Sequence, residues 1–126
     1  MAAQGSLNLK RAYDDVSKKD GYRILVDRLW PRGVSKEHAA IDLWAKEITP
    51  TTDIREAFHH EPDLFPAFKK QYLSELENNP DMPAFIQTVS DRLKKGNVTF
   101  VYAAKDPVYN HVVILKEYVE KLLPKK

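Results

Sequence analysis

The sequence predicts a single compact α/β domain in which helices flank a small, mostly parallel β-sheet in a Rossmann-like layering. Residues 22–29 contain a continuous apolar triplet, and residues 98–104 form the longest apolar run, as expected for strands covered on both faces. Segments with helical spacing of apolar side chains alternate with these strands, which is typical of α/β proteins. A chain of 126 residues fits one core, so we expect residues 1–126 to form one domain.

Two strands and a turn are expected in the first third of the chain. Residues 7–13 alternate weakly between apolar and polar side chains, which indicates a first strand. The Asp20-Gly21 pair predicts a turn before the strand at residues 22–29. Pro31 and Gly33 end that strand, because proline lacks a donor and glycine favours turns.

The next stretch predicts a short helix and one ambiguous segment. The Ser35 hydroxyl can accept an orphan backbone N–H, so we expect it to cap a helix that runs through Ala40. Residues 41–48 suit either a strand or a helix, and their alternation favours a strand.

Four further helices are expected, each with one apolar face. Short polar side chains precede them and can cap them, namely Thr51 or Thr52, Asp81 and Asn110. Gly96 follows the third of these helices, where a C′ glycine is typical. The expected helices cover residues 53–59, about 62 or 64 to 78, 82–95, and about 111–123.

Composition excludes several function classes. Twenty Lys and Arg against eighteen Asp and Glu give a net charge of +2, which is too mild to imply nucleic acid or an anionic membrane. The chain has no Cys, so disulfides, thiolate catalysis and cysteine metal sites are excluded. No apolar run is long enough to cross a membrane, and the N-terminus lacks a secretion signal. We therefore expect a cytoplasmic protein with no membrane partner.

Ligands of parallel sheets bind beyond the carboxyl ends of the strands, which directs attention to the segment after the second strand. That segment contains Arg28, Trp30 and Arg32. Guanidinium groups match phosphate or carboxylate, and an indole can stack on a planar ring. The structural alternative is that Asp27 pairs with an arginine and that Trp30 belongs to the core.

The second strand-end segment leads into the last helix. Its N-terminus offers unpaired N–H groups and a positive dipole, and no acidic residue occupies its first turn. Lys105 would add a positive charge, Asn110 lies at the cap, and His111 could act as an acid or base. The alternative is that Asn110 only caps the helix and that His111 bonds a carbonyl. Arg55 could join the positively charged residues at these strand ends, or it could be a solvated charge on the surface.

Other site types are not predicted. The adjacent pair His59-His60 lacks the spacing that places two metal ligands on one helix face. No glycine-rich phosphate loop, dinucleotide fingerprint or nucleophile elbow is present, so no cofactor and no metal are expected.

Several blocks of the sequence match one known family. They are residues 10–14, 20–33, 47–50 and 102–105, together with Trp44, Ile54-Arg55 and Asn110-His111. Through these blocks the chain resembles the YeaO-like family, a bacterial domain of unknown function (number 488). The resemblance implies a compact α/β fold and a bacterial cytoplasmic setting, and it supplies no particular activity. In wider relatives a Cys-His-Arg motif stands where this chain has Asn110, His111 and Val112, so a thiol mechanism does not transfer.

Three hypotheses follow from the sequence. The first is a pocket for a phosphate-bearing or other anionic small molecule at the strand ends, with His111 as the candidate acid or base. The second is a nucleic-acid-binding module that uses the same cations, which the mild net charge disfavours. The third is an interaction or structural protein in which Arg28 and Arg32 pair internally with Asp27, Asp42 or Glu47.

Overall fold

The computed structural model describes residues 5–58, 61–104 and 110–123, and it has the predicted α/β architecture. The described strands form one sheet in the order β1-β4-β2-β3, and each neighbouring pair is parallel. Residues after the ends of β2 and β4 therefore meet at one edge of the sheet. The strands are β1 (Leu7–Arg11), β2 (Tyr22–Leu25), β3 (Leu43–Trp44) and β4 (Val98–Tyr102).

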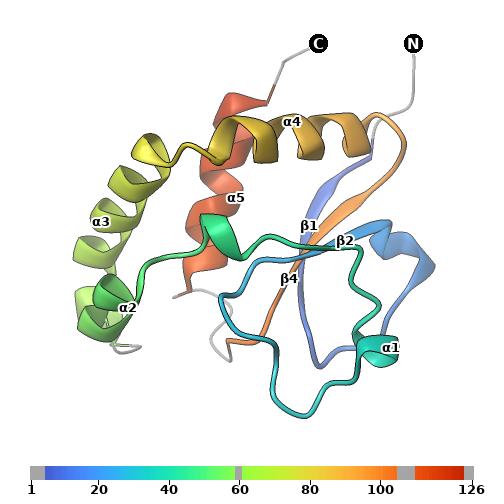
Figure 1. Ribbon diagram of the computed structural model, residues 1–126, viewed down its shortest axis with the longest axis horizontal. Helices are drawn as coiled ribbons and strands as arrows, with labels where there is room; N and C mark the ends of the chain where they lie inside the picture. Colours follow the sequence, from blue (N-terminus) through green and yellow to red (C-terminus); the bar gives the residue numbers. More distant parts are fainter. Residues whose placement is uncertain (1–4, 59–60, 105–109, 124–126) are drawn as a thin grey trace.

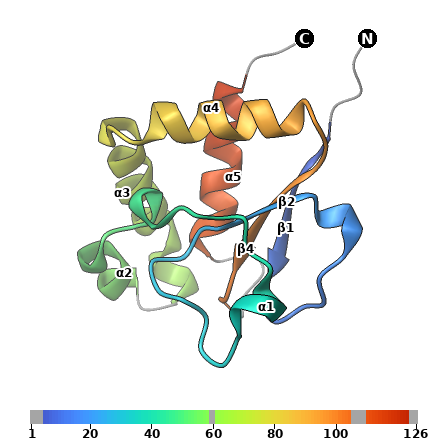
Figure 2. The same ribbon diagram turned by 45° about the vertical axis from the view of Figure 1, so that its right-hand side comes forward.

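The longer helices gather on one side of the molecule, away from the short α1 (Figures 1 and 2). The helices are α1 (Lys36–Ala39), α2 (Thr52–Phe58), α3 (Phe65–Asn78), α4 (Met82–Leu93) and α5 (His111–Leu122). Short 3₁₀ turns cover Lys18–Asp20, Lys46–Ile48 and Pro62–Leu64. The expected layering is thus uneven, because among the described residues the other face of the sheet has only α1 and loops against it.

Side chains alternate between two cores across the central strands, as the pleat of a strand requires. Ile24, Val26 and Phe100 face the main core beneath the long helices. Leu25 and Val101 face a smaller cluster on the other side, together with the two tryptophans. Both faces are covered, which explains the continuous apolar triplet in the sequence.

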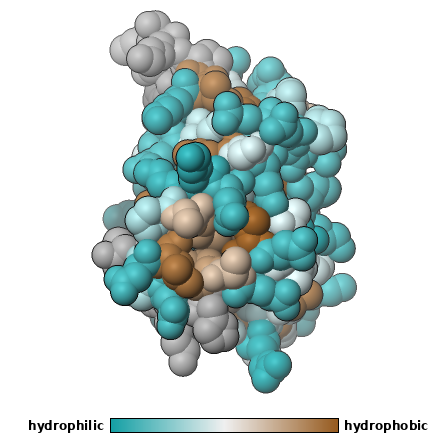
Figure 3. Space-filling view, turned by 90° about the vertical axis from the view of Figure 1, so that its left-hand side faces the viewer, coloured by the Kyte–Doolittle hydropathy of each residue, from teal (hydrophilic) through white to brown (hydrophobic). Residues whose placement is uncertain are grey.

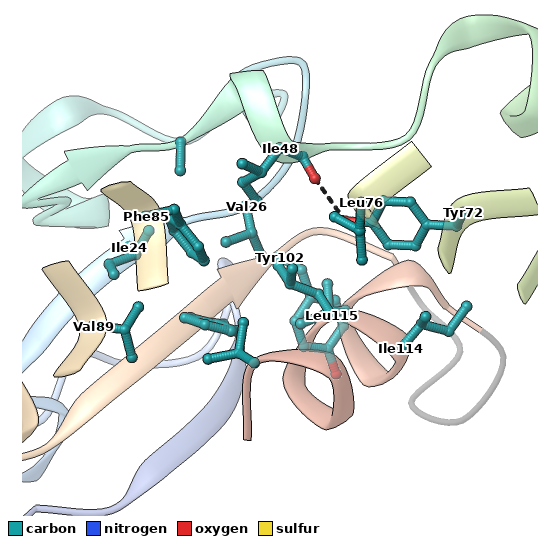
Figure 4. Close-up of a cluster of buried hydrophobic side chains, with 14 of the residues drawn as sticks. Ile24, Val26, Ile48, Tyr72, Leu76, Phe85, Val89, Tyr102, Ile114 and Leu115 are labelled. Atoms are coloured by element: carbon teal, nitrogen blue, oxygen red, sulfur yellow. Dashed lines mark hydrogen bonds between the residues drawn. The ribbon is translucent and has the colours of Figure 1, made fainter. Parts of the chain in front are cut away.

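A buried tyrosine connects α3 to the segment that follows β3. Tyr72 is fully buried, and its hydroxyl donates a hydrogen bond of 2.7 Å to the Ile48 carbonyl, as Figure 4 shows. Burial, with Glu75 and Asp27 nearby, raises the pKa of Tyr72 well above its ordinary value. The hydroxyl therefore stays protonated and remains a donor at neutral pH.

The ambiguous segment at residues 41–48 contains both kinds of structure. Only Leu43 and Trp44 pair with β2, so the favoured strand exists but is two residues long. A 3₁₀ turn follows at once, and it points Ile48 into the core. The indole N–H of Trp44 donates to the Asp27 carbonyl over 2.7 Å and holds this edge against the end of β2.

The helix caps are partly as predicted. Ser35 accepts the His38 N–H, and Asn110 accepts the Val112 and Val113 N–H groups, so both caps are confirmed. Asp81 was the wrong choice, because it has a helical backbone (φ −88°, ψ −11°) and makes no side-chain cap bond.

Two further residues that were expected at helix ends act differently from the prediction, Thr51 before α2 and Gly96 after α4. The Thr51 hydroxyl donates to Glu75 of α3 instead of accepting a backbone N–H of α2. Of the described glycines, only Gly21 (φ 65°) and Gly33 (φ 78°) have positive φ, so Gly96 is not a left-handed cap. Gly96 instead continues the helical turn, and its N–H donates to the Arg92 carbonyl.

A charge cluster on the second face of the sheet was not predicted. Asp20 contacts Lys10 over 2.8 Å and Arg23 over 2.6 Å, and its side chain is 8% exposed. Burial alone would raise the pKa of Asp20, but the bonds from Lys10, the Ser17 N–H and Arg23 lower it below the ordinary value. Arg23 also donates to the Ala39 carbonyl, so this cluster fixes α1 to the sheet.

The face that carries α2 and α3 is mostly hydrophilic, with a compact hydrophobic patch in its lower half (Figure 3). None of the helices in the described ranges is long and apolar enough to cross a membrane.

Candidate functional site

A cavity of about 810 Å³ opens at the carboxyl ends of β2 and β4. Its walls come from six parts of the chain: the segment after β2, the segment before α2, α2 itself, α3, the end of β4, and the start of α5. A volume of this size is typical of small-molecule pockets. The lining residues are Asp27–Arg32, Thr49, Pro50, Thr52, Arg55, Glu56, Phe58, Phe68, Ala103, Ala104, Asn110 and His111.

The structure brings most of the sequence-predicted site residues to this cavity. Those that line it are Arg28, Trp30, Arg32, Arg55, Asn110 and His111. Lys105 lies outside the described residues, as does the pair His59-His60. The two strand-end segments therefore converge, and Arg32 and His111 face one cavity rather than opposite sides of the protein.

The three arginines of the cavity differ in how they are held. Arg28 is half-buried, and its Nε donates to the Pro50 carbonyl over 3.3 Å. Arg32 and Arg55 are exposed at the mouth. Within the described residues, no carboxylate lies at ion-pairing distance from any of these guanidinium groups.

The predicted internal pairing of Arg28 and Arg32 is therefore not seen in the described part of the chain. Asp42, one proposed partner, instead accepts the backbone N–H of Arg23. Asp27, another proposed partner, instead lies close to His111 and accepts the Ala103 N–H at the end of β4.

Asp27 and His111 form a pair at the inner end of the cavity. His111 Nε2 lies 2.6 Å from the Val26 carbonyl oxygen and 3.4 Å from Asp27 Oδ1. A carbonyl oxygen only accepts, so the contact with Val26 requires a proton on Nε2. Nε2 is therefore held as a donor to the backbone.

The Asp27 carboxylate is held by the backbone as well. Its Oδ2 accepts the Ala103 N–H over 2.8 Å, which joins the end of β2 to the end of β4. Burial raises the pKa of Asp27 above its ordinary value, while His111, the Ala103 N–H and Arg55 act in the opposite direction. Burial thus destabilises the ionised form of Asp27, and the ends of two strands hold its carboxylate at the cavity.

The N-terminus of α5 is partly satisfied by the chain itself. Asn110 is buried, and its side-chain oxygen accepts the Val112 N–H over 2.9 Å and the Val113 N–H over 3.1 Å. Two of the N–H groups that the sequence offered to an external anion are therefore occupied. Positive charge at this site comes mainly from the arginines.

Trp30 packs against the smaller core and also lines the cavity. Its indole N–H donates to the Val34 carbonyl over 2.7 Å, and its ring meets Trp44 edge-on at 5.5 Å between centroids. These contacts place Trp30 against the smaller core, as the structural alternative predicted, while it still lines the cavity.

Two phenylalanines that sequence reasoning did not select form an apolar wall of the cavity. Phe58 of α2 and Phe68 of α3 stack at 4.6 Å between ring centroids with an interplanar angle of 19°. Both are buried. The N-terminus of α2 is fixed to α3 because Glu75 accepts both the N–H and the hydroxyl of Thr51.

The sequence analysis considered Asp27 only as a partner of an arginine, whereas the structure places it in the cavity lining beside His111. A carboxylate directly after a buried strand is the signal that could have identified it. The phenylalanine wall had no such signal, because its helical spacing is the same as that of any core face. In the described ranges, no group of three His, Asp or Glu residues could hold a metal ion.

Comparisons with known proteins place the chain among bacterial relatives. The sequence model of a family described as the inactive DUF488-N3 subclade matches residues 6–126. The uncharacterized protein YeaO of Escherichia coli (strain K12) is 43% identical over 117 residues, covering 93% of this chain and 99% of that protein. The uncharacterized protein Rv3073c of Mycobacterium tuberculosis (strain ATCC 25618 / H37Rv) is 30% identical over 117 residues, covering 93% and 96%. No solved structure matches the chain.

Proposed function

The chain belongs to the inactive DUF488-N3 subclade, and from this premise we propose that it binds a phosphate-bearing or other anionic small molecule without converting it. The ligand would occupy the cavity at the ends of β2 and β4. Arg28, Arg32 and Arg55 would bind its anionic group.

One observation supports this proposal above the others. Three guanidinium groups, from the segment after β2 and from α2, line a single cavity of about 810 Å³. Charged side chains brought together in this way repel one another unless counter-charge is supplied. Asp27 and Glu56 also line the cavity, but no carboxylate of the described residues lies within ion-pairing distance of these guanidinium groups, so their N–H groups can bind an external anion.

Binding without turnover is the simpler form of the proposal. The family description includes the word inactive, and the chain has no Cys to act as a nucleophile. His111 Nε2 is already a donor to the Val26 carbonyl, which suits an orienting contact better than proton transfer.

Isothermal titration with phenyl phosphate tests the proposal at two salt concentrations. We expect saturable binding that weakens by about tenfold in each of Arg32→Gln and Arg55→Gln, because each removes a charge-assisted bond. Arg92→Gln on α4 is the matched control, since it removes the same charge from an exposed position outside the cavity lining.

Absence of binding by phenyl phosphate, inorganic phosphate and sulfate would overturn the proposal. Equal weakening in all three variants would also contradict it, because the effect would then come from net charge alone. Tight binding of short DNA or RNA duplexes with a steep salt dependence, lost in the cavity variants, would replace it with the nucleic-acid reading.

A further inference from the structure

We propose that the ligand is a ring-bearing anion with a hydrogen-bond donor at the end opposite its anionic group. The ring would pack against the phenylalanine wall, and the donor would bind Asp27. This inference rests on the proposed function and specifies the ligand class of the same cavity.

The charged residues of the cavity lining differ in sign and in exposure. Arg32, Arg55 and Glu56 are exposed, whereas the side chain of Asp27 is only 14% exposed. A ligand that reaches from the exposed arginines to Asp27 therefore meets donors at one end and an acceptor at the other. An anionic group near the arginines and a donor near Asp27 would complement this arrangement.

Asp27 retains capacity to accept a bond from a ligand. A carboxylate has about four lone-pair sites. In the described structure, its side chain accepts the Ala103 N–H over 2.8 Å and lies 3.4 Å from His111 Nε2, a distance too long for a strong bond. The carboxylate also costs stability through burial, which is expected for a functional residue.

Part of the cavity lining is apolar. Phe58, Phe68 and Pro50 line the cavity, and all three are buried, so little of their surface is in contact with water. A small inorganic anion at the arginines would make no use of these side chains. A planar or hydrocarbon ring packed against them would transfer its own apolar surface out of water and add affinity.

A second anionic group at the inner end is disfavoured by the same geometry. A carboxylate brought against the part-buried Asp27 would be repelled at close range in a poorly solvated site. The cavity should therefore discriminate between ligands that differ only at the end far from the phosphate.

Four probes test this inference with the full chain, measured by isothermal titration at pH 7. They are inorganic phosphate, phenyl phosphate, 4-aminophenyl phosphate and 4-carboxyphenyl phosphate. We expect phenyl phosphate to bind at least tenfold more tightly than inorganic phosphate. The amino compound should bind about tenfold more tightly than phenyl phosphate, and the carboxy compound about tenfold more weakly.

Asp27→Asn gives the matched variant, since Asn can still accept the Ala103 N–H. Its affinities for the three ring compounds should fall within about twofold to threefold of one another. Should this variant fail to fold, the ranking in the unaltered protein still decides the question.

The outcomes separate this inference from the proposed function. Equal binding of inorganic and phenyl phosphate, or equal binding of the three ring compounds, would overturn the inference while anion binding stands. No binding by any of the four probes would overturn both.

Discussion

Two aspartates of this chain lie in opposite electrostatic surroundings. Asp20 contacts Lys10 and Arg23, and these bonds lower its pKa in spite of burial. Asp27 is half-buried at the cavity, and burial raises its pKa although His111 and Arg55 partly offset the effect. Ionisation of the first therefore stabilises the fold, and ionisation of the second costs stability.

The Asp20→Asn variant should lower the free energy of unfolding by about 2–3 kcal/mol at pH 7, because it leaves Arg23 without its charged partner. The pKa of Asp20 in the native state is below its ordinary value of 3.8. The stabilisation that its charge provides is therefore fully present above pH 3.8, and it is lost as the pH falls through the native pKa. Urea unfolding of both proteins at pH 7 and at pH 3 measures this. A gap that does not narrow in acid would contradict the assignment.

The Asp27→Asn variant should have the opposite effect on stability. The native pKa is above 3.8, so the native state binds the proton more tightly, and stability falls as the pH rises from 3.8 through the native pKa. Removing this charge should leave the free energy of unfolding at pH 7 equal to or above that of the unaltered protein. A marked loss of stability would show that Asp27 is structural.

At the scale of elements, two helices that look alike in the sequence begin differently. Both α4 and α5 follow a short polar residue, but only Asn110 accepts backbone N–H groups, while Asp81 makes no side-chain cap bond. Propensity identifies a capping residue type and not the backbone angles that let it cap.

The Asn110→Ala variant should therefore lower the free energy of unfolding by about 1–2 kcal/mol through loss of the α5 cap. Asp81→Ala is the matched control and should change it by no more than about 0.5 kcal/mol. Chemical denaturation of both variants measures the difference. Equal losses in the two would be inconsistent with the observed caps.

The strands and long helices could be predicted because their signals are local. The apolar triplet of β2 and the helical spacing in α3, α4 and α5 each describe a buried face within one segment. The segment at residues 41–48 could not be resolved, because its end depends on Ile48 turning into a core supplied by distant residues. Tertiary packing decides such cases over local preference.

At the scale of the whole molecule, the candidate site arises from the parallel sheet. The ends of β2 and β4 are adjacent because these strands pair, so Arg28 and Arg32 line the same cavity as His111, which is far from them in the sequence. The rule that ligands bind beyond the carboxyl ends of parallel strands was enough to select these residues. The wall of Phe58 and Phe68 could not be selected, because the position of α2 depends on contacts with α3 that no single segment shows.

A crystal structure of the protein grown with phenyl phosphate tests the central claim most directly. The account predicts phosphate oxygens within hydrogen-bond distance of the guanidinium groups of Arg28, Arg32 or Arg55, with the ring directed toward Phe58 and Phe68. A cavity that remains empty at saturating ligand, or one whose arginines are instead paired with the protein's own carboxylates, would contradict it.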